Sequence, residues 1–457
     1  MKMAIKPQNF RSLQNVRIIG TFDQPIVGAT IDSRKVAPGN LFVALPGENT
    51  DGHTFIPNAI KSGASAVLCN ANWAGAANWN GVVPLITVPD VTIALGELAR
   101  NHRRNFDLPI LAITGTNGKT TTKNMIAAIL AKRYSLLKTE GNLNNQLGLP
   151  LTLLHLDESH TATVLEMGAS HAGDIAYLCE IAEPTEGLIT NVGHAHLEYF
   201  KSIENVQKVK GELFSYLGDA GTRYVNSDDS RVMALVTNAV RCVNFSETSV
   251  AGMSLEISGK DEWGCFSILL DNKTDIQLKV SGSIMVQNAA AAIAVGLTHQ
   301  ISQDDIKSAL ENYPGEKGRM QRIDIHGFHV IHDAYNANPE SSRQSITTVA
   351  KLSFPKRRIV VFADMLELGE SSSAEHAEIG KIIADNAINA AFLYGPETVV
   401  TANFLRKNAS VLTQHFNDKN ALGDALAHFL MPGDVVLLKG SRSMGLETLI
   451  PVLEGHS

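Results

Sequence analysis

The sequence predicts an α/β protein with three domains that contain parallel sheets. Its 457 residues exceed the size of a single hydrophobic core. Apolar runs of strand length alternate with helical patterns along much of the chain, which favours doubly wound sheets. We expect a small N-terminal α/β domain over residues 1–86, a central parallel-sheet domain over 87–312 and a C-terminal Rossmann-like, doubly wound domain over 313–457.

The composition is that of an ordinary soluble globular protein, with 44% hydrophobic residues and a mean hydropathy of +0.00. A net charge of −7 gives no long-range attraction to nucleic acid or to an anionic membrane, so we expect neither partner. The four cysteines lack the spacing of a zinc site or a redox pair. Because no apolar stretch has the length of a signal peptide or a membrane span, we expect a cytoplasmic protein.

The N-terminal domain offers one candidate phosphate contact. A possible strand leads into Ser33 and Arg34, and further strands are expected at 40–45 and 66–68 on either side of a helix at 54–62. A hydroxyl and a guanidinium at the end of a strand can bind a phosphate group. A turn with an arginine in solvent explains the same residues equally well, and the pattern leaves both interpretations open.

A glycine-rich loop lies between a buried strand, Ile110–Ile113, and a helical pattern that begins at Lys119. Two glycines let backbone N–H groups surround an anion, the helix directs the positive end of its dipole toward that anion, and Lys119 adds a full charge. Thr120 places a hydroxyl where a phosphate-bound Mg²⁺ would lie. Although Ile113 occupies the first glycine position of the G-x-x-x-x-G-K-[ST] pattern, strand, loop and helix together disfavour a plain turn with a solvated lysine. The predicted phosphate-binding residues are Gly115, Thr116, Asn117, Gly118, Lys119, Thr120 and Thr121.

An amide-rich turn over residues 139–148 follows the phosphate loop. Its asparagines Asn142, Asn144 and Asn145 can donate and accept hydrogen bonds at once, which suits a substrate with amide or sugar groups. Turn chemistry alone would explain two of these asparagines but hardly three. They are therefore candidate substrate-binding residues.

Two further strands of the central domain end in residues that could bind a metal ion. The strand 162–165 ends at Glu166, and the strand 187–192 leads into His194 and His196. Ligands gather beyond the carboxyl ends of strands in an open parallel sheet. A carboxylate and an imidazole near a nucleotide phosphate can hold a second Mg²⁺, although a structural histidine is the simpler interpretation of His196.

Lys210 lies in an amphipathic helical pattern over residues 206–214, where a solvated lysine is the simplest interpretation. From 225 to 281 strands and turns dominate, and helices return at 288–297 and 304–312. Two tetrapeptides, at 261–264 and 272–275, imitate the D-x-x-G and N-K-x-D motifs of GTP-binding switches. They lie too close together for an intervening βαβ unit, so we interpret this region as hairpins.

The C-terminal domain is expected to begin with a hairpin over residues 323–330 that contains Gly327. The strand that follows leads into Asp333, Asn336 and Asn338. Its alternation of strands and helical patterns predicts a doubly wound sheet. The expected buried strands lie at 358–363, 391–394 and 434–439.

Taken together, these motifs resemble the Mur ligase family, the ATP-dependent amide-forming enzymes of bacterial cell-wall precursor synthesis. The resemblance rests on the order and spacing of many short motifs over nearly the whole chain, and it implies a P-loop ATPase domain at the centre. Folate-polyglutamate ligases share the phosphate loop but not the domain that contains residues 32–34. The motifs that carry the resemblance are 32–34, 41–47, 51–53, 115–121, 141–145, 166–169, 196–198, 210–212, 318–319, 333–339, 364–369 and 439–443.

The resemblance assigns roles to residues of the central domain. It implies that Lys119 holds the β- and γ-phosphates of ATP, that Thr120 binds one Mg²⁺ ion, and that a second ion is bound by Glu166 and His196. Lys210 would be carbamylated, which converts a cation into an anionic ligand beside the metal.

The resemblance also implies contacts to ATP outside the phosphate loop. Arg319 and Asp333 would complete the ATP site from the C-terminal domain, and Asn288 would contact adenine. The family pattern before Asn288 usually contains His-Asn, whereas Ile284 and Met285 stand here, so the adenine contact that the family pattern makes at this point is expected to differ.

The implied reaction uses ATP, two Mg²⁺ ions and two small-molecule substrates, UDP-N-acetylmuramoyl-tripeptide and D-alanyl-D-alanine. The tripeptide carboxylate would attack the γ-phosphate, and the dipeptide amine would then attack the resulting acyl phosphate. We expect a monomer. The alternatives are a family member that adds the third amino acid, whose Asp-Asn-Pro-Arg tetrapeptide is absent from this chain, and a nucleotide-dependent switch or regulatory binding protein.

Overall fold

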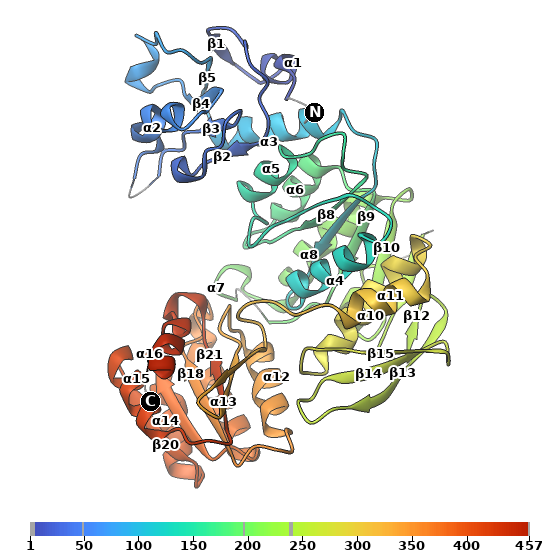
Figure 1. Cartoon of the computed structure of the whole chain (residues 1–457), viewed down its shortest axis with the longest axis vertical. Coiled ribbons are helices and arrows are strands. Elements are labelled where there is room, and N and C mark those ends of the chain that lie inside the picture. The colour runs from blue at the N-terminus through green and yellow to red at the C-terminus, as the bar shows by residue number, and fades with distance from the viewer. Residues whose placement is uncertain (1–4, 48–49, 195–196, 237–240, 456–457) are drawn as a thin grey trace.

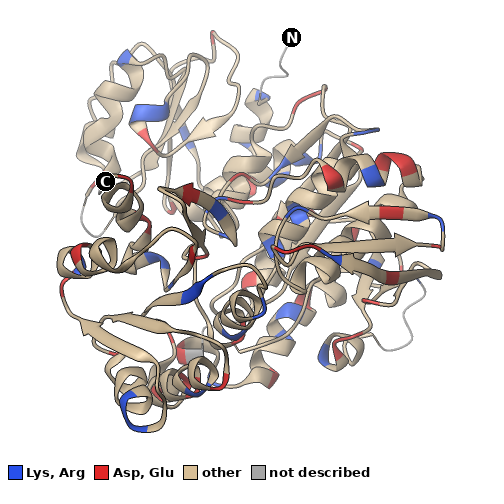
Figure 2. Cartoon of the chain, turned by 60° about the horizontal axis from the view of Figure 1, so that its bottom comes forward, with Lys and Arg blue, Asp and Glu red and all other residues tan. Residues whose placement is uncertain are grey.

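Three α/β domains follow one another along the chain in the computed structural model, which describes residues 5–47, 50–194, 197–236 and 241–455 (Figure 1). The N-terminal and C-terminal domains lie at opposite ends of the molecule, and the central domain lies between them in sequence (Figure 1). Acidic and basic residues are interspersed over all three domains (Figure 2). Among the residues described, no helix combines the length and the apolar character that crossing a membrane requires.

The N-terminal sheet has five strands in the order β1-β5-β4-β3-β2, with β1 antiparallel to β5 and the other pairs parallel. The prediction that the central domain begins at residue 87 is wrong, because β5 (Leu85–Val88) pairs with β4 and β1 in this first sheet. The boundary expected after residue 86 therefore cuts through a strand. The elements are α1 (Pro7–Arg11), β1 (Arg17–Ile19), β2 (Ala29–Thr30), η1 (Ser33–Lys35), β3 (Leu41–Val43), η2 (Gly52–Phe55), α2 (Ile56–Lys61), β4 (Ala66–Asn70), η3 (Ala74–Ala76), β5 (Leu85–Val88) and α3 (Val91–Arg103).

The central sheet has ten strands, and the strand that precedes the phosphate loop lies inside its parallel part. The order is β15-β14-β13-β12-β11-β10-β9-β6-β8-β7, parallel from β7 to β11 and antiparallel from there to β15. All five residues of β6 are buried, as expected of an apolar strand covered on both faces. The strands are β6 (Ile110–Thr114), β7 (Leu136–Lys138), β8 (Ala162–Glu166), β9 (Glu186–Ile189), β10 (Thr222–Asn226), β11 (Cys242–Phe245), β12 (Ser249–Val250), β13 (Met253–Lys260), β14 (Phe266–Leu270) and β15 (Thr274–Gln277).

The alanine-rich helix α10 packs against the helix that follows the phosphate loop, α4. Small alanine side chains let the two helices approach closely, and residues 289–295 of α10 are buried. The helix begins at Ile284, four residues before the predicted start at 288. The helices are α4 (Lys119–Leu130), α5 (Gly148–Leu153), α6 (Asp174–Ala182), α7 (Leu197–Phe200), α8 (Ile203–Leu217), α9 (Ser230–Met233), α10 (Ile284–Thr298) and α11 (Gln303–Glu311).

Both tetrapeptides that imitate guanine-binding motifs lie in hairpins, as predicted. Residues 261–264 form the turn between β13 and β14, where Gly264 N–H donates to Asp261 O at 3.0 Å. Asp271 and Asn272, with φ of 51° and 55°, form the left-handed turn between β14 and β15. The alternative of a nucleotide-dependent switch or regulatory binding protein thereby loses one of the two motifs that suggested it, and the phosphate loop remains.

The C-terminal sheet has six strands in the order β16-β17-β21-β18-β19-β20, all parallel except the β16–β17 hairpin. The predicted hairpin is confirmed, and its turn places His326 and Gly327 at positive φ values of 44° and 84°. The elements are β16 (Gln321–Ile325), β17 (Phe328–His332), α12 (Pro339–Ala350), β18 (Arg357–Ala363), η4 (Gly369–Ser371), α13 (Ser372–Asp385), β19 (Ala390–Tyr394), α14 (Val399–Asn408), β20 (Leu412–Phe416), α15 (Lys419–Phe429), β21 (Asp434–Lys439), η5 (Arg442–Met444), η6 (Leu446–Thr448) and α16 (Leu449–Gly455).

The hydrophobic cores set the C-terminal domain apart from the other two domains. One apolar cluster continues from the first sheet through α3 into the central domain, so these two domains share a core. Two clusters on the faces of the third sheet belong to the C-terminal domain. The C-terminal domain is thus a separate body docked against the central one.

Candidate active site

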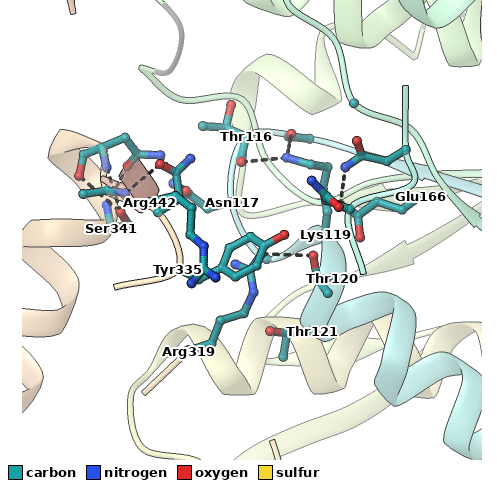
Figure 3. A pocket seen from close by; sticks show the side chains of 18 of the residues that line it. Thr116, Asn117, Lys119, Thr120, Thr121, Glu166, Arg319, Tyr335, Ser341 and Arg442 are labelled. Atoms are coloured by element: carbon teal, nitrogen blue, oxygen red, sulfur yellow. Dashed lines mark hydrogen bonds between the residues drawn. The ribbon is translucent and has the colours of Figure 1, made fainter. Parts of the chain in front are cut away.

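A pocket of about 860 Å³ lies between the central and C-terminal domains (Figure 3). One wall contains the loop after β6, the end of β8 and parts of α8 and α10. The other wall contains the segments that follow β17, β18 and β21. All of the lining residues that the structure describes belong to these two domains. The carboxyl ends of strands from two sheets therefore face one cavity, which is where ligands bind in open α/β sheets.

The phosphate loop after β6 requires glycine at both of its glycine positions. Gly115 and Gly118 have φ values of 141° and 81°, which side chains rarely adopt. A Cβ atom at Gly115 would lie 2.0 Å from Thr190 Oγ1, and one at Gly118 would lie 2.5 Å from Asn288 Oδ1. The loop is therefore held tightly between its neighbours, with its backbone open to the pocket.

Lys119, the first residue of α4, folds back over the phosphate loop. Its Nζ donates to the carbonyl oxygens of Gly115 at 2.8 Å and Thr116 at 3.0 Å (Figure 3). Burial lowers the pKa of Lys119, and the nearby Arg319 charge acts in the same direction while Glu166 opposes it. A polyanion bound at this loop would stabilise the charged ammonium group.

Glu166, at the end of β8, offers a buried carboxylate oxygen to the pocket. The residue is 3% exposed, and its Oε1 accepts a 2.8 Å hydrogen bond from Asn144 Nδ2. Its Oε2 has no hydrogen-bond partner among the described residues, and the nearby Lys123 Nζ lies 3.9 Å away. An orphaned carboxylate oxygen in a pocket suits a hard divalent cation.

The described residues form no group of three or more His, Cys, Asp or Glu side chains that could hold a metal ion. His196, predicted as the partner of Glu166, lies outside the described residues. Thr120 Oγ1, the other predicted Mg²⁺ ligand, accepts a hydrogen bond from Arg319 Nη2 at 3.1 Å. A cation at Thr120 would have to displace this hydrogen bond.

Tyr335 lies between two guanidinium groups on the C-terminal wall of the pocket (Figure 3). The Cζ of Arg319 is 4.3 Å and that of Arg442 is 5.7 Å from the centre of the ring. These distances allow cation–π attraction, which holds Arg319 toward the phosphate loop, and no Asp or Glu among the described residues forms an ion pair with it. Arg319 therefore keeps its charge available to an anionic ligand.

Asp333, the predicted ATP contact after β17, is engaged by neighbours of its own domain. Its carboxylate accepts hydrogen bonds from Lys439 Nζ at 2.8 Å, Ser345 Oγ at 2.5 Å and the N–H of Met320 at 3.0 Å. The Lys439 ammonium also donates to Asn336 O at 3.0 Å. Asp333 lines the pocket, but in this geometry it also fixes the segment that carries Arg319.

Two asparagines join the phosphate loop to its surroundings. Asn288 is buried in α10 and accepts a 3.1 Å hydrogen bond from Thr122 Oγ1. Asn338 caps α12 and donates from Nδ2 to Asn117 Oδ1 at 2.8 Å, across the boundary between the domains. The predicted adenine contact thus packs beside the loop.

Lys210 is buried in α8 and lines the pocket, so the interpretation as a solvated lysine is wrong. The residue is 3% exposed. Burial, and next the charge of Lys119, lower the pKa of Lys210 to about 7. A large fraction of this amine is therefore neutral near pH 7.

The lowered pKa of Lys210 predicts a pH dependence of stability. Between pH 7 and pH 10 the unfolded chain, with an ordinary lysine pKa, binds more protons than the folded chain, so stability rises with pH in this window. In CO₂-free buffer, we expect the free energy of unfolding of the parent to gain up to about 1.4 kcal/mol per pH unit relative to Lys210→Met. Urea titrations at pH 7, 8 and 9 measure this, with the exposed Lys208→Met as control. Parallel curves for parent and Lys210→Met would contradict the shift.

Ser33 and Arg34, the predicted phosphate contacts of the N-terminal domain, do not reach this pocket. Ser33 is buried in η1, and the exposed guanidinium of Arg34 pairs with Asp32 at 2.9 Å. Of the amide cluster, Asn142, Asn144 and Asn145 all line the pocket. Asn144 holds Glu166, whereas Asn145 accepts hydrogen bonds from backbone N–H groups at the start of α5.

Sequence reasoning missed four residues around this site. Lys123, one helical turn after Lys119, donates to Thr139 O at 2.6 Å behind Glu166. Its spacing of four residues from Lys119 on the same helix could have revealed it. Tyr335, Lys439 and Arg442 lie within motifs that the family resemblance covers, but no spacing rule connects residues so far apart in sequence.

The fold and the site together define an enzyme that uses a nucleoside triphosphate, since a phosphate loop opens into a cleft shared by two α/β domains. Three family models match the chain: the Mur ligase family catalytic domain over residues 25–103, the Mur ligase middle domain over 113–296 and the Mur ligase glutamate ligase domain over 318–442. The chain belongs to the Mur ligase family, and it is a ligase.

Named relatives and solved structures agree with this assignment. The chain is 32% identical to a UDP-N-acetylmuramoyl-tripeptide–D-alanyl-D-alanine ligase from Bacillus subtilis, over 94% of this chain and 93% of the relative. It is 33% identical to the enzyme of that name from Escherichia coli, over 94% of both chains. A crystal structure of MurF from Acinetobacter baumannii matches with a TM-score of 0.86 and 28% identity over 99% of both chains. MurF from Thermotoga maritima in complex with ADP matches with a TM-score of 0.80 and 28% identity, over 94% of this chain and 97% of that one.

Proposed function

We propose that this ligase joins the terminal carboxylate of UDP-N-acetylmuramoyl-tripeptide to the amino group of D-alanyl-D-alanine and cleaves ATP to ADP and phosphate. The observation that carries the proposal is the pocket in which Lys119 and Arg319, from two domains, flank a phosphate loop beside the buried Glu166. The names of the relatives from Bacillus subtilis and Escherichia coli support this choice of substrates. The ADP complex of the Thermotoga maritima protein supports ATP as the nucleotide.

In the first step, a carboxylate oxygen of the tripeptide attacks the γ-phosphorus of ATP. A C–O–P linkage forms, the bond from the γ-phosphorus to the bridging oxygen breaks, and ADP leaves with the electron pair. Nucleophile, nucleotide and transition state are all anionic, so the chief task of the protein is to offset negative charge. Lys119, Arg319 and the backbone N–H groups of the phosphate loop serve this purpose.

In the second step, the dipeptide amine attacks the acyl carbon, the bond from that carbon to the phosphate oxygen breaks, and the nitrogen loses a proton. Water must be kept from the acyl phosphate, which it would hydrolyse. A pocket between two domains can exclude water when it is filled. Residues proposed to position the substrates in the pocket are Asn142, Asn144, Asn145, Asn336 and Asn338. Ser33 and Arg34, outside the pocket, are proposed to hold the UDP end of the first substrate from the N-terminal domain.

We infer two Mg²⁺ ions at this site, one held by Thr120 and one by Glu166 with His196. The orphaned Oε2 of Glu166 supports a cation there. Bound Mg²⁺ would supply Lewis-acid polarisation of the phosphoryl oxygens. Thr120 is available once Arg319 exchanges its hydrogen bond to Oγ1 for an anionic partner.

We further propose that Lys210 is carbamylated. Its neutral amine can add to CO₂ and lose one proton, which yields an N-bound carboxylate in place of a buried cation. The pKa of about 7 supports this step, because the neutral amine is the nucleophile. We also propose that the reaction takes place in the cytoplasm, where ATP and UDP-linked precursors are available, and that the protein acts as a monomer.

Reconstitution with purified full-length protein tests the proposed function. We expect phosphate release and a UDP-linked pentapeptide mass only when ATP, Mg²⁺, UDP-N-acetylmuramoyl-tripeptide and D-alanyl-D-alanine are all present. The tripeptide is supplied with lysine or with diaminopimelate as its third residue, which identifies the natural form. L-alanyl-L-alanine serves as the matched control for the dipeptide.

Three outcomes would contradict this function. Phosphate release without the dipeptide would remove the amide-forming step. Preference for GTP would favour the nucleotide-dependent switch. Turnover with UDP-N-acetylmuramoyl-dipeptide and a free amino acid in place of these substrates would identify the ligase that adds the third residue.

A further inference from the structure

The turn between β13 and β14 presents a tryptophan to the C-terminal domain. Asp261 Oδ1 accepts hydrogen bonds from the N–H groups of Trp263 at 3.0 Å and Cys265 at 2.8 Å, and Gly264 takes a positive φ of 73°. The turn is thus fixed from within. The turn is the tetrapeptide at 261–264 that imitates a guanine-binding motif, and none of its four residues lines the pocket between the domains.

Trp263 packs against three side chains of the C-terminal domain. The Cζ of Arg322 lies 3.5 Å from the centre of the indole ring, the ring of Phe354 at 4.2 Å and that of His329 at 4.7 Å. We call these four residues the Trp263 corner. Cation–π and aromatic contacts of this kind attract beyond simple burial of area.

Arg322 is held in place by its own domain. Asp324 accepts hydrogen bonds from Arg322 Nε at 3.0 Å and Nη2 at 3.1 Å, and its Oδ1 lies 2.5 Å from His329 Nδ1. Arg322 is part of β16, three residues after Arg319. The corner therefore fixes strand β16 in position. The segment just before β16 contains Arg319, which donates a hydrogen bond to Thr120.

The contacts near the opposite edge of the pocket are polar. Glu198 N–H donates to Glu367 O at 3.2 Å, and His194 Nδ1 lies 4.0 Å from Glu375 Oε1. These interactions exchange readily with water, so they add little to docking. Asn338 and Arg319 also donate across the boundary, to Asn117 and Thr120, and Met320 packs against the apolar clusters of both domains. The Trp263 corner adds the aromatic and cation–π contacts to this interface.

We propose that Trp263 is a positioning residue that holds the C-terminal domain in the docked arrangement, with Arg319 at the phosphate loop. The kinetic part of this inference rests on the proposed function, but the structural part does not. We take the docked arrangement to be the one that binds ATP. Loss of the corner then lowers the population of the docked arrangement, and the apparent KM for ATP rises in inverse proportion to that population. Saturating ATP restores the docked arrangement, so kcat is retained.

The kinetic test compares Trp263→Ala with the parent and with Trp263→Phe. We expect the KM for ATP to rise about tenfold in Trp263→Ala, with kcat within twofold of the parent, and Phe to restore most of the loss. Phe429→Ala is the matched control, because Arg357 stacks on Phe429 at 4.5 Å within the C-terminal domain. A merely structural role would lower the active fraction and kcat at unchanged KM, and that result would overturn the proposal.

A distance measurement tests the same inference without turnover. Cys242 in β11 is exposed while the other three cysteines are buried, so it can be spin-labelled together with Lys407→Cys in α14. We expect one narrow distance distribution in the full-length parent and in Phe429→Ala, and a broad one in Trp263→Ala. Should Trp263→Ala fail to fold, Arg322→Leu removes the stack and leaves the tryptophan in place.

The two readouts separate the inference from the proposed function. A narrow distribution in the folded variants would overturn the positioning role, whatever the enzyme makes. A broad distribution supports it even if reconstitution yields no ligase product, because the measurement requires no substrate.

Discussion

Replacement of Lys119 by methionine is expected to lower kcat/KM for ATP by about 10³-fold or more. The Nζ of Lys119 lies over the phosphate loop, held by the carbonyl oxygens of Gly115 and Thr116. Its positive charge acts in a buried site, where one well-placed donor to developing negative charge contributes about 3–4 kcal/mol to transition-state stabilisation. Methionine keeps the length and apolar stem of the side chain but supplies no charge.

This loss of activity in Lys119→Met should occur while the protein stays folded. Burial disfavours the charged ammonium group in the absence of ligand, so its removal relieves a desolvation cost while two hydrogen bonds disappear. Phosphate release over a range of ATP concentrations, with the other substrates saturating, measures kcat/KM for ATP, and a thermal melt measures stability. Lys132→Met, at an exposed lysine just beyond the same helix, is the matched control. A Lys119→Met enzyme within tenfold of the parent would exclude the phosphate role.

Much of the fold could be predicted because local patterns determine it. At the phosphate site, local sequence alone indicates each of the three elements: the apolar strand, the glycine loop and the helix. In the C-terminal domain, the two left-handed residues His326 and Gly327 form the turn that specifies the hairpin. The boundary after residue 86 was misplaced because β5 pairs with β1, where Leu85 lies opposite Ile19, 66 positions earlier in the chain (85 − 19). Pairing at that separation leaves no local signal in an apolar tetrapeptide.

The candidate site was predictable at strand ends and less so elsewhere. Glu166 and the asparagines at 142–145 lie in the pocket, as the carboxyl ends of parallel strands require. Lys210 was misjudged from its helical pattern because an amphipathic repeat does not tell a lysine in solvent from one that faces a cavity. Asp333 pairs with Lys439, and only the meeting of β17 and β21 brings those residues together.

Replacement of Lys210 by alanine is expected to lower kcat by about 10²–10³-fold, with partial rescue by acetate or formate. If Lys210 carries an N-bound carboxylate, alanine removes the anion and leaves a space that a short carboxylic acid can enter. The exposed Lys208→Ala, on the same helix, should retain activity and show no response to added acids. Rescue is measured as the ratio of phosphate release with and without each acid, after correction for ionic strength with chloride.

Rescue would separate a chemical role of Lys210 from a packing role. A lysine that only filled space would be replaced by any molecule of similar size, so acetamide, neutral and isosteric with acetate, should rescue as well. A carboxylate needed for its charge responds to acetate and not to acetamide. In ¹³CO₂-equilibrated parent protein, the same hypothesis requires a carbamate signal in the ¹³C spectrum that is missing from Lys210→Ala. Equal rescue by both molecules, or identical spectra, would assign Lys210 to packing, because neither result is compatible with an anion formed on a buried amine whose pKa lies near 7.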